Sequence, residues 1–77
     1  MSTYRFGSYS PGIGVVEVWN ENHERICLQF PAHYRPNGDF AVDFEGDTVI
    51  ITDAWDPSIR FVANLAGACH NDLIDLG

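Results

Sequence analysis

The stretch from residue 35 to residue 53 constrains the fold more than any other. It reads RPNGDFAVDFEGDTVIITD and holds one turn signal at residues 36–39 and a second at residues 46–47. At residues 36–39 proline presets φ and Asn-Gly tolerates positive φ, which favours a tight turn, and Gly46-Asp47 gives a second tight connection. Between the turns, apolar and other side chains alternate with the period of a strand. One face would carry Phe40, Val42 and Phe44, and the other Ala41, Asp43 and Glu45.

Three further segments have strand patterns: residues 13–19, 24–30 and 48–52. The first and last are rich in β-branched residues, and the middle one alternates apolar with other side chains. Together with residues 40–45, these segments are joined by short connections. The connections predict that residues 24–30, 40–45 and 48–52 form an antiparallel meander, with residues 13–19 as a neighbour. A short edge strand at residues 4–6 would end at the Gly-, Ser- and Pro-containing segment 7–12.

The last third of the chain fits two structures. Asp56 suits a helix N-cap, Pro57 suits the first helical position, and Gly67 suits the end of the helix. The apolar residues of segment 59–66 fit helical spacing, yet alternate residues from 59 to 65 also fit a strand. We therefore predict one α+β domain over residues 1–77, with an antiparallel sheet of four strands and a helix near the C-terminus. A fifth strand over residues 57–66 is the alternative.

Length and charge limit the functions available. The chain has 77 residues, 11 acidic and four basic side chains, no lysine and a net charge of −7. So small a domain leaves little room for an enclosed catalytic pocket. Direct nucleic-acid binding needs clustered cations, and anionic membranes repel acid, so we expect neither partner. A basic protein surface is the expected partner.

Candidate ligands and nucleophiles lack a motif. The side chains in question are His23, Cys27, His33, Cys69 and His70. Their spacing matches no structural zinc pattern, so we expect neither a metal nor a cofactor. A cysteine could pair with His33 or His70 as nucleophile and base, but no local signature surrounds either cysteine. We therefore expect no enzyme. With no secretory signal or membrane span in the sequence, we expect a cytoplasmic protein whose two thiols are buried.

The acidic residues are the strongest functional candidates. Carboxylates two residues apart on a strand lie about 6.6 to 6.8 Å apart, close to the spacing of alternate phosphates along one DNA strand. Tryptophan beside such acids would serve as an interface anchor. The predicted partner-binding residues are Asp39, Asp43, Glu45, Asp47, Trp55 and Asp56. The competing interpretation is that the acids form the solvated face of a two-layer domain.

The chain resembles the small acidic anti-CRISPR proteins of phages. The shared features are its small size, its acidic balance, the absence of lysine, and the acids Asp39, Asp43, Glu45 and Asp47. Those proteins share no sequence motif, so the resemblance assigns no residue a role. It implies a DNA-mimic inhibitor that docks on the basic groove of a CRISPR effector in the host cytoplasm. The alternative is an antitoxin-like or immunity-type interaction module that binds through aromatic and apolar surface. Sequence does not define the oligomeric state.

Overall fold

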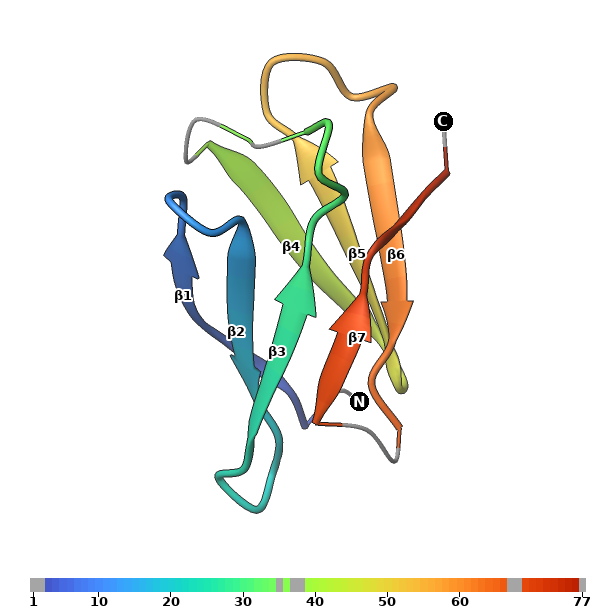
Figure 1. Cartoon of the computed structure of the whole chain (residues 1–77). Helices are drawn as coiled ribbons and strands as arrows, with labels where there is room; N and C mark the ends of the chain where they lie inside the picture. The colour runs from blue at the N-terminus through green and yellow to red at the C-terminus, as the bar shows by residue number, and fades with distance from the viewer. Residues whose placement is uncertain (1–2, 35, 37–38, 67–68, 77) are drawn as a thin grey trace.

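The computed structural model describes residues 3–34, 36, 39–66 and 69–76. These residues form two four-stranded β-sheets, in which every strand pair except β3–β7 is antiparallel. Sheet A has the strand order β1-β2-β3-β7, and sheet B has the order β4-β5-β6-β8 (Figure 1). The strands of sheet A are β1 (Arg5–Ser10), β2 (Val15–Trp19), β3 (Arg25–Gln29) and β7 (His70–Asp72). The strands of sheet B are β4 (Phe40–Glu45), β5 (Thr48–Asp53), β6 (Arg60–Asn64) and β8 (Ile74–Asp75).

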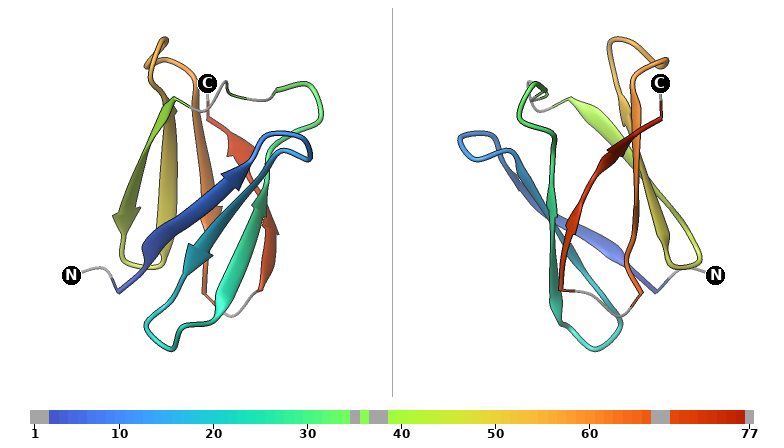
Figure 2. Two further views of the ribbon diagram at one scale, coloured as in Figure 1. Left: turned by 90° about the vertical axis from the view of Figure 1, so that its left-hand side faces the viewer. Right: turned by 45° about the vertical axis from the view of Figure 1, so that its right-hand side comes forward.

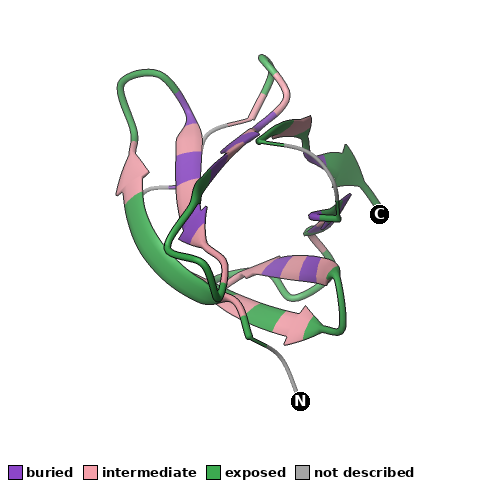
Figure 3. Cartoon of the chain, turned by 90° about the horizontal axis from the view of Figure 1, so that it is seen from below, coloured by how far each residue is buried: buried purple, intermediate pink, exposed green. Residues whose placement is uncertain are grey.

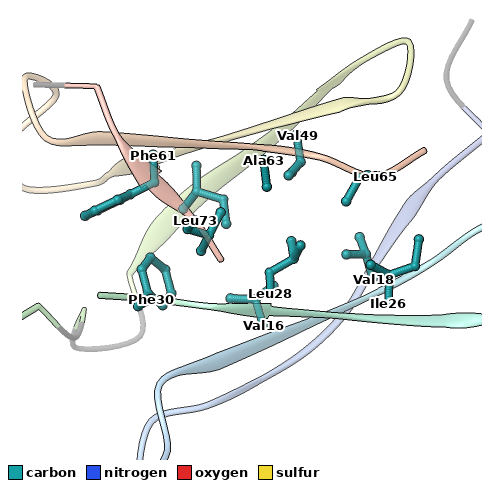
Figure 4. Close-up of a cluster of buried hydrophobic side chains, with 11 residues drawn as sticks. Val16, Val18, Ile26, Leu28, Phe30, Val49, Phe61, Ala63, Leu65 and Leu73 are labelled. Carbon is teal, nitrogen blue, oxygen red and sulfur yellow. The ribbon is translucent and has the colours of Figure 1, made fainter. Parts of the chain in front are cut away.

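The core lies between the two sheets. Buried side chains alternate with half-buried or exposed ones along β2, β3, β5 and β6, so each strand turns one apolar face inward (Figure 3). Sheet A and the segment after it contribute Val16, Val18, Ile26, Leu28 and Phe30. Facing them are Val49, Phe61, Ala63, Leu65 and Leu73 (Figure 4), and Ile51 of β5 belongs to the same cluster. Burial of each larger side chain contributes about 1.5 to 3 kcal/mol, and this term holds the two sheets together.

One C-terminal segment joins the sheets on one side. β7 pairs in parallel with β3, and β8, only two residues further on, pairs antiparallel with β6. Between them Leu73 is buried, and its N–H donates to the Gln29 carbonyl over 2.9 Å. Figure 2 shows this segment lying between β3 and β6 where the sheets converge. The segment therefore closes one side of the sandwich by backbone hydrogen bonds.

Aromatic packing takes the place of backbone pairing on the opposite side. There the edge strands β1 and β4 belong to different sheets. Tyr4 stacks on Phe44 with ring centroids 6.1 Å apart, and Tyr9 meets Phe40 edge-to-face at 5.1 Å. Phe6 also contacts Phe40 edge-to-face at 6.0 Å. Such ring pairs stabilise by about 0.5 to 1.5 kcal/mol beyond their buried area.

The predicted α+β class and C-terminal helix are wrong. The described residues contain no helix, and the segment predicted as helical holds β6. Asp56 does cap a turn, because its Oδ1 accepts hydrogen bonds from the N–H and hydroxyl of Ser58, but the turn leads into a strand. Alternate residues Phe61, Ala63 and Leu65 then enter the core, as the alternative strand prediction requires. Gly67, the predicted helix end, lies outside the described residues.

The predicted single meander is also wrong. β3 lies in sheet A and β4 in sheet B, so the two strands do not pair (Figure 1). Local alternation defines which face of a strand is apolar, but two sheets sharing a core satisfy it as well as one. The strand expected at residues 4–6 runs on to Ser10, past a register shift at Gly7. The turn predicted at residues 36–39 falls partly outside the described residues.

Candidate functional site

The outer face of β4 is acidic, as its alternation predicts. Ala41, Asp43 and Glu45 are exposed, and Asp39 is exposed immediately before the strand. The alternate residues of β4 are half-buried against the core, where Phe44 contacts Tyr4 and Phe40 contacts Tyr9 of β1. β4 turns into β5 through Gly46, whose φ of 59° suits the first central position of a type II′ hairpin. The next residue, Asp47, is exposed and accepts a 2.9 Å hydrogen bond from the Tyr4 hydroxyl.

These carboxylates have no close cation within the described residues. The salt bridge found there joins Arg25 and Glu17 at 3.6 Å on sheet A. Arg60 shares the outer face of sheet B, in one row with Ala41 and Thr52. That row puts Arg60 two strands from β4, about 10 Å away. Asp39, Asp43 and Glu45 therefore present negative charge to solvent without an ion-pair partner from the described chain.

Trp55 stands out from the loop between β5 and β6. Its side chain is 78% exposed, and its backbone N–H donates to Asp53 Oδ1 over 2.7 Å. The same oxygen accepts from the N–H of Asp56 at 3.0 Å, and the other oxygen of Asp53 accepts from the Tyr34 hydroxyl. These three donors favour the carboxylate and lower the pKa of Asp53. Trp55 is thus presented by a loop that hydrogen bonds hold in place.

A hollow of about 330 Å³ lies where β4 begins. Its lining residues are Asp39, Phe40, Ala54 and Trp55. The Ala54 N–H donates to the Asp39 carbonyl over 3.2 Å, which ties the loop to the start of β4. The fold therefore brings Asp39 and Trp55 together.

The six predicted site residues are spread along the length of sheet B. Asp39, Trp55 and Asp56 lie at the end of sheet B that carries the β5–β6 loop. Glu45 and Asp47 lie at the β4–β5 turn, which Figure 1 shows at the opposite end of the sheet, and Asp43 lies between. β4 thus carries acid from one end of the sheet to the other.

An apolar row crosses the outer face of sheet B beside these acids. The ladder places Asp43 opposite Ile50, Ile50 opposite Val62, and Val62 opposite Ile74. The apolar part of this row, from Ile50 to Ile74, is about 10 Å long, because neighbouring strands lie about 4.8 Å apart. Ile74 is 63% exposed and Leu76, two residues further, is 51% exposed. Sequence reasoning missed this surface, although Val62 signalled it by breaking the alternation of its segment.

The cysteines and histidines of the described residues lie on or near sheet A. Cys27 lies in register with His70 on one side and Glu17 on the other, across the outer face of sheet A. In the described residues, however, no three His, Cys, Asp or Glu side chains gather to hold a metal ion. Both cysteines are free, with Cys27 half-buried and Cys69 exposed, so the prediction of two buried thiols is wrong. A second hollow of about 370 Å³ includes Cys69 and Arg25 at the β2–β3 end.

These strands define an all-β protein of two four-stranded sheets. Comparison with protein-family models, curated proteins and solved structures gives no match. No helix in the described residues is long and apolar enough to cross a membrane.

Proposed function

We propose that the protein is a binding module that attaches through the β4 side of sheet B to the basic surface of a nucleic-acid-handling protein. It would act as an inhibitor, in the manner of a DNA mimic. The observation that carries the proposal is the row of exposed carboxylates along β4, with no ion-pair partner among the described residues. Asp39, Asp43 and Glu45 supply this charge, and Trp55 adds an exposed aromatic anchor at one end.

The acids of β4 and a basic partner surface are complementary in charge. Uncompensated acid on a rigid strand attracts a basic surface and accelerates encounter with it. Proteins that hold nucleic acid do so in positively charged channels, so their surfaces suit this strand. Tryptophan is enriched among the residues that dominate binding energy, and Trp55 is exposed beside the acids. The acids would set the rate and specificity of association, and Trp55 would slow dissociation.

Charge reversal on β4 tests the proposal. The variant Asp43→Arg/Glu45→Arg changes the net charge from −7 to −3. A matched control, Glu21→Arg/Asp72→Arg, makes the same change at exposed positions of the β2–β3 loop and β7. Immobilised wild-type protein and both variants are used to capture partners from cells of the native host, and the captured proteins are identified by mass spectrometry. A captured nucleic-acid-binding protein is then assayed for DNA binding with and without each variant.

The β4 variant should lose the partner while the control retains it, with thermal midpoints close to that of the wild type. Wild-type protein should also compete with DNA for the partner, and its binding should weaken markedly with added salt. Equal capture by wild type and the β4 variant would disprove a role for these acids.

A second candidate is favoured by the exposed Ile74 and Leu76 at the end of the apolar row. An antitoxin-like or immunity-type module, or a homodimer, would use this surface instead of the acids. Binding that is insensitive to salt and to the β4 charge reversal would support it. The same capture experiment therefore separates the two functions.

A further inference from the structure

The hollow at the start of β4 has the chemistry of a cation site. Its lining combines one carboxylate, Asp39, with two aromatic side chains, Phe40 and Trp55, and the small side chain of Ala54. Its volume of about 330 Å³ falls at the lower end of the range for ligand pockets. That size suits a single side chain more than a drug-sized molecule.

Asp39 is the carboxylate available to a ligand there. Its side chain is exposed and forms no hydrogen bond or ion pair with the described residues. Asp53, by contrast, uses both of its oxygens within the protein, on Tyr34 and on the N–H groups of Trp55 and Asp56. Asp53 therefore fixes the loop, and Asp39 remains to receive a charge from outside.

Trp55 supplies the second half of the site. A cation over an indole face gains about 0.5 to 1 kcal/mol at an exposed position. Guanidinium groups are planar, stack on aromatic rings and donate two hydrogen bonds to one carboxylate, which an ammonium group does not match. We propose that this hollow binds one arginine side chain of the partner, with the guanidinium on Trp55 and paired to Asp39. This inference rests on the proposed function and names the partner group that anchors it.

Small model compounds test the site without the partner. The probe is N-acetyl-arginine N-methylamide, titrated into 15N-labelled protein and followed by NMR. The neutral isostere N-acetyl-citrulline N-methylamide is the matched control ligand, and the corresponding lysine compound tests the preference for a guanidinium. The Trp19 indole N–H is an internal reference, because Trp19 lies on sheet A and does not line the hollow.

The arginine compound should shift the Trp55 indole and the Ala54 amide resonances saturably at millimolar concentration, with Trp19 unmoved. The citrulline and lysine compounds should bind at least two-fold more weakly. Asp39→Asn and Trp55→Leu should each weaken arginine binding about two- to five-fold, the range that exposed ion pairs and cation–π contacts give. Asp43→Asn, which removes the same charge outside the hollow, should leave it unchanged. The NMR spectrum of each variant reports whether it is folded.

Equal binding of the citrulline and arginine compounds would overturn the inference. So would the absence of a Trp55 shift at a probe concentration on the order of 100 mM, because the affinity would then be too weak to matter. The proposed function fails differently, because it is tested by Asp43 and Glu45 with the whole partner. If the β4 charge reversal abolishes partner capture but the arginine compound does not bind, the arginine site is refuted and the proposed function stands. If the arginine compound binds but the β4 charge reversal leaves partner capture unchanged, the arginine site stands and the proposed function is refuted.

Discussion

Replacing Gly7 by alanine should destabilise the protein by about 1 to 2 kcal/mol. A Cβ at this position would lie 2.5 Å from Trp19 Nε1, 2.9 Å from Trp19 Cδ1 and 3.0 Å from the Glu17 carbonyl oxygen. Overpacking of this kind costs about 1 to 3 kcal/mol. Alanine also restricts the unfolded chain and so returns about 0.4 to 1 kcal/mol, because Gly7 does not have positive φ. The steric cost exceeds this gain, and the net effect is a loss.

Urea unfolding measures the effect, with Gly12→Ala as the matched control. Gly12 also lacks positive φ, and a Cβ there would have no atom within 4 Å, so alanine should be neutral or stabilise by up to about 1 kcal/mol. In the background Trp19→Val, which removes the two closest atoms, the cost of Gly7→Ala should fall by at least half. Midpoints should move at constant slope.

Equal stability of the Gly7 and Gly12 variants would refute the reasoning. It would mean that the indole of Trp19 moves aside without cost, so that the register shift of β1 is not required by close packing. An undiminished loss in the Trp19→Val background would instead assign the whole cost to the Glu17 carbonyl.

Two further predictions concern the core and the loop that presents Trp55. Leu28→Ala should lower the free energy of unfolding by about 3 to 5 kcal/mol, because Leu28 is fully buried between the sheets. Urea unfolding measures the loss, and a value below about 1 kcal/mol would contradict the buried position of Leu28. Tyr34→Phe should lower the thermal midpoint between pH 5 and 9, and the gap from wild type should shrink below pH 3.8 and above pH 10. Burial and the hydrogen bond to Asp53 raise the pKa of Tyr34 above 10.0, so the contribution of Tyr34 to folding stability is lost as the pH rises above that value. The same bond lowers the pKa of Asp53 below 3.8, so the contribution of the Asp53 carboxylate is lost as the pH falls from 3.8 through the lowered value. A gap independent of pH from 2 to 11 would show that the Tyr34–Asp53 bond does not contribute.

Local pattern was enough to predict strands β2 to β5 and the acidic face of β4. Phe40, Val42 and Phe44 turn inward and Asp43 and Glu45 turn outward, because a strand places alternate side chains on opposite faces whatever it packs against. Gly46 likewise forms a tight hairpin turn. These features depend on neighbouring residues alone, so the sequence displays them directly.

Long-range pairing was not predictable in the same way. Asp56 and Pro57 give the same signal for a helix start and for the turn that the structure contains. The difference is decided by Phe61 and Leu65, which are buried against residues of the other sheet. The hollow was not predicted. Asp39 and Trp55 were separate candidates, and only the structure shows that both line it, with the Ala54 N–H bonded to the Asp39 carbonyl.

The joining segment, β7 with β8, also has a consequence for biosynthesis. Chains are made from the N-terminus, so residues 70–75 leave the ribosome after every other strand described here. Until they arrive, β3 and β6 each have one edge without a backbone partner, and such edges recruit other chains. These two edges are therefore open in the interval between synthesis of β6 and docking of β7 and β8, when a chaperone that covers them would prevent aggregation.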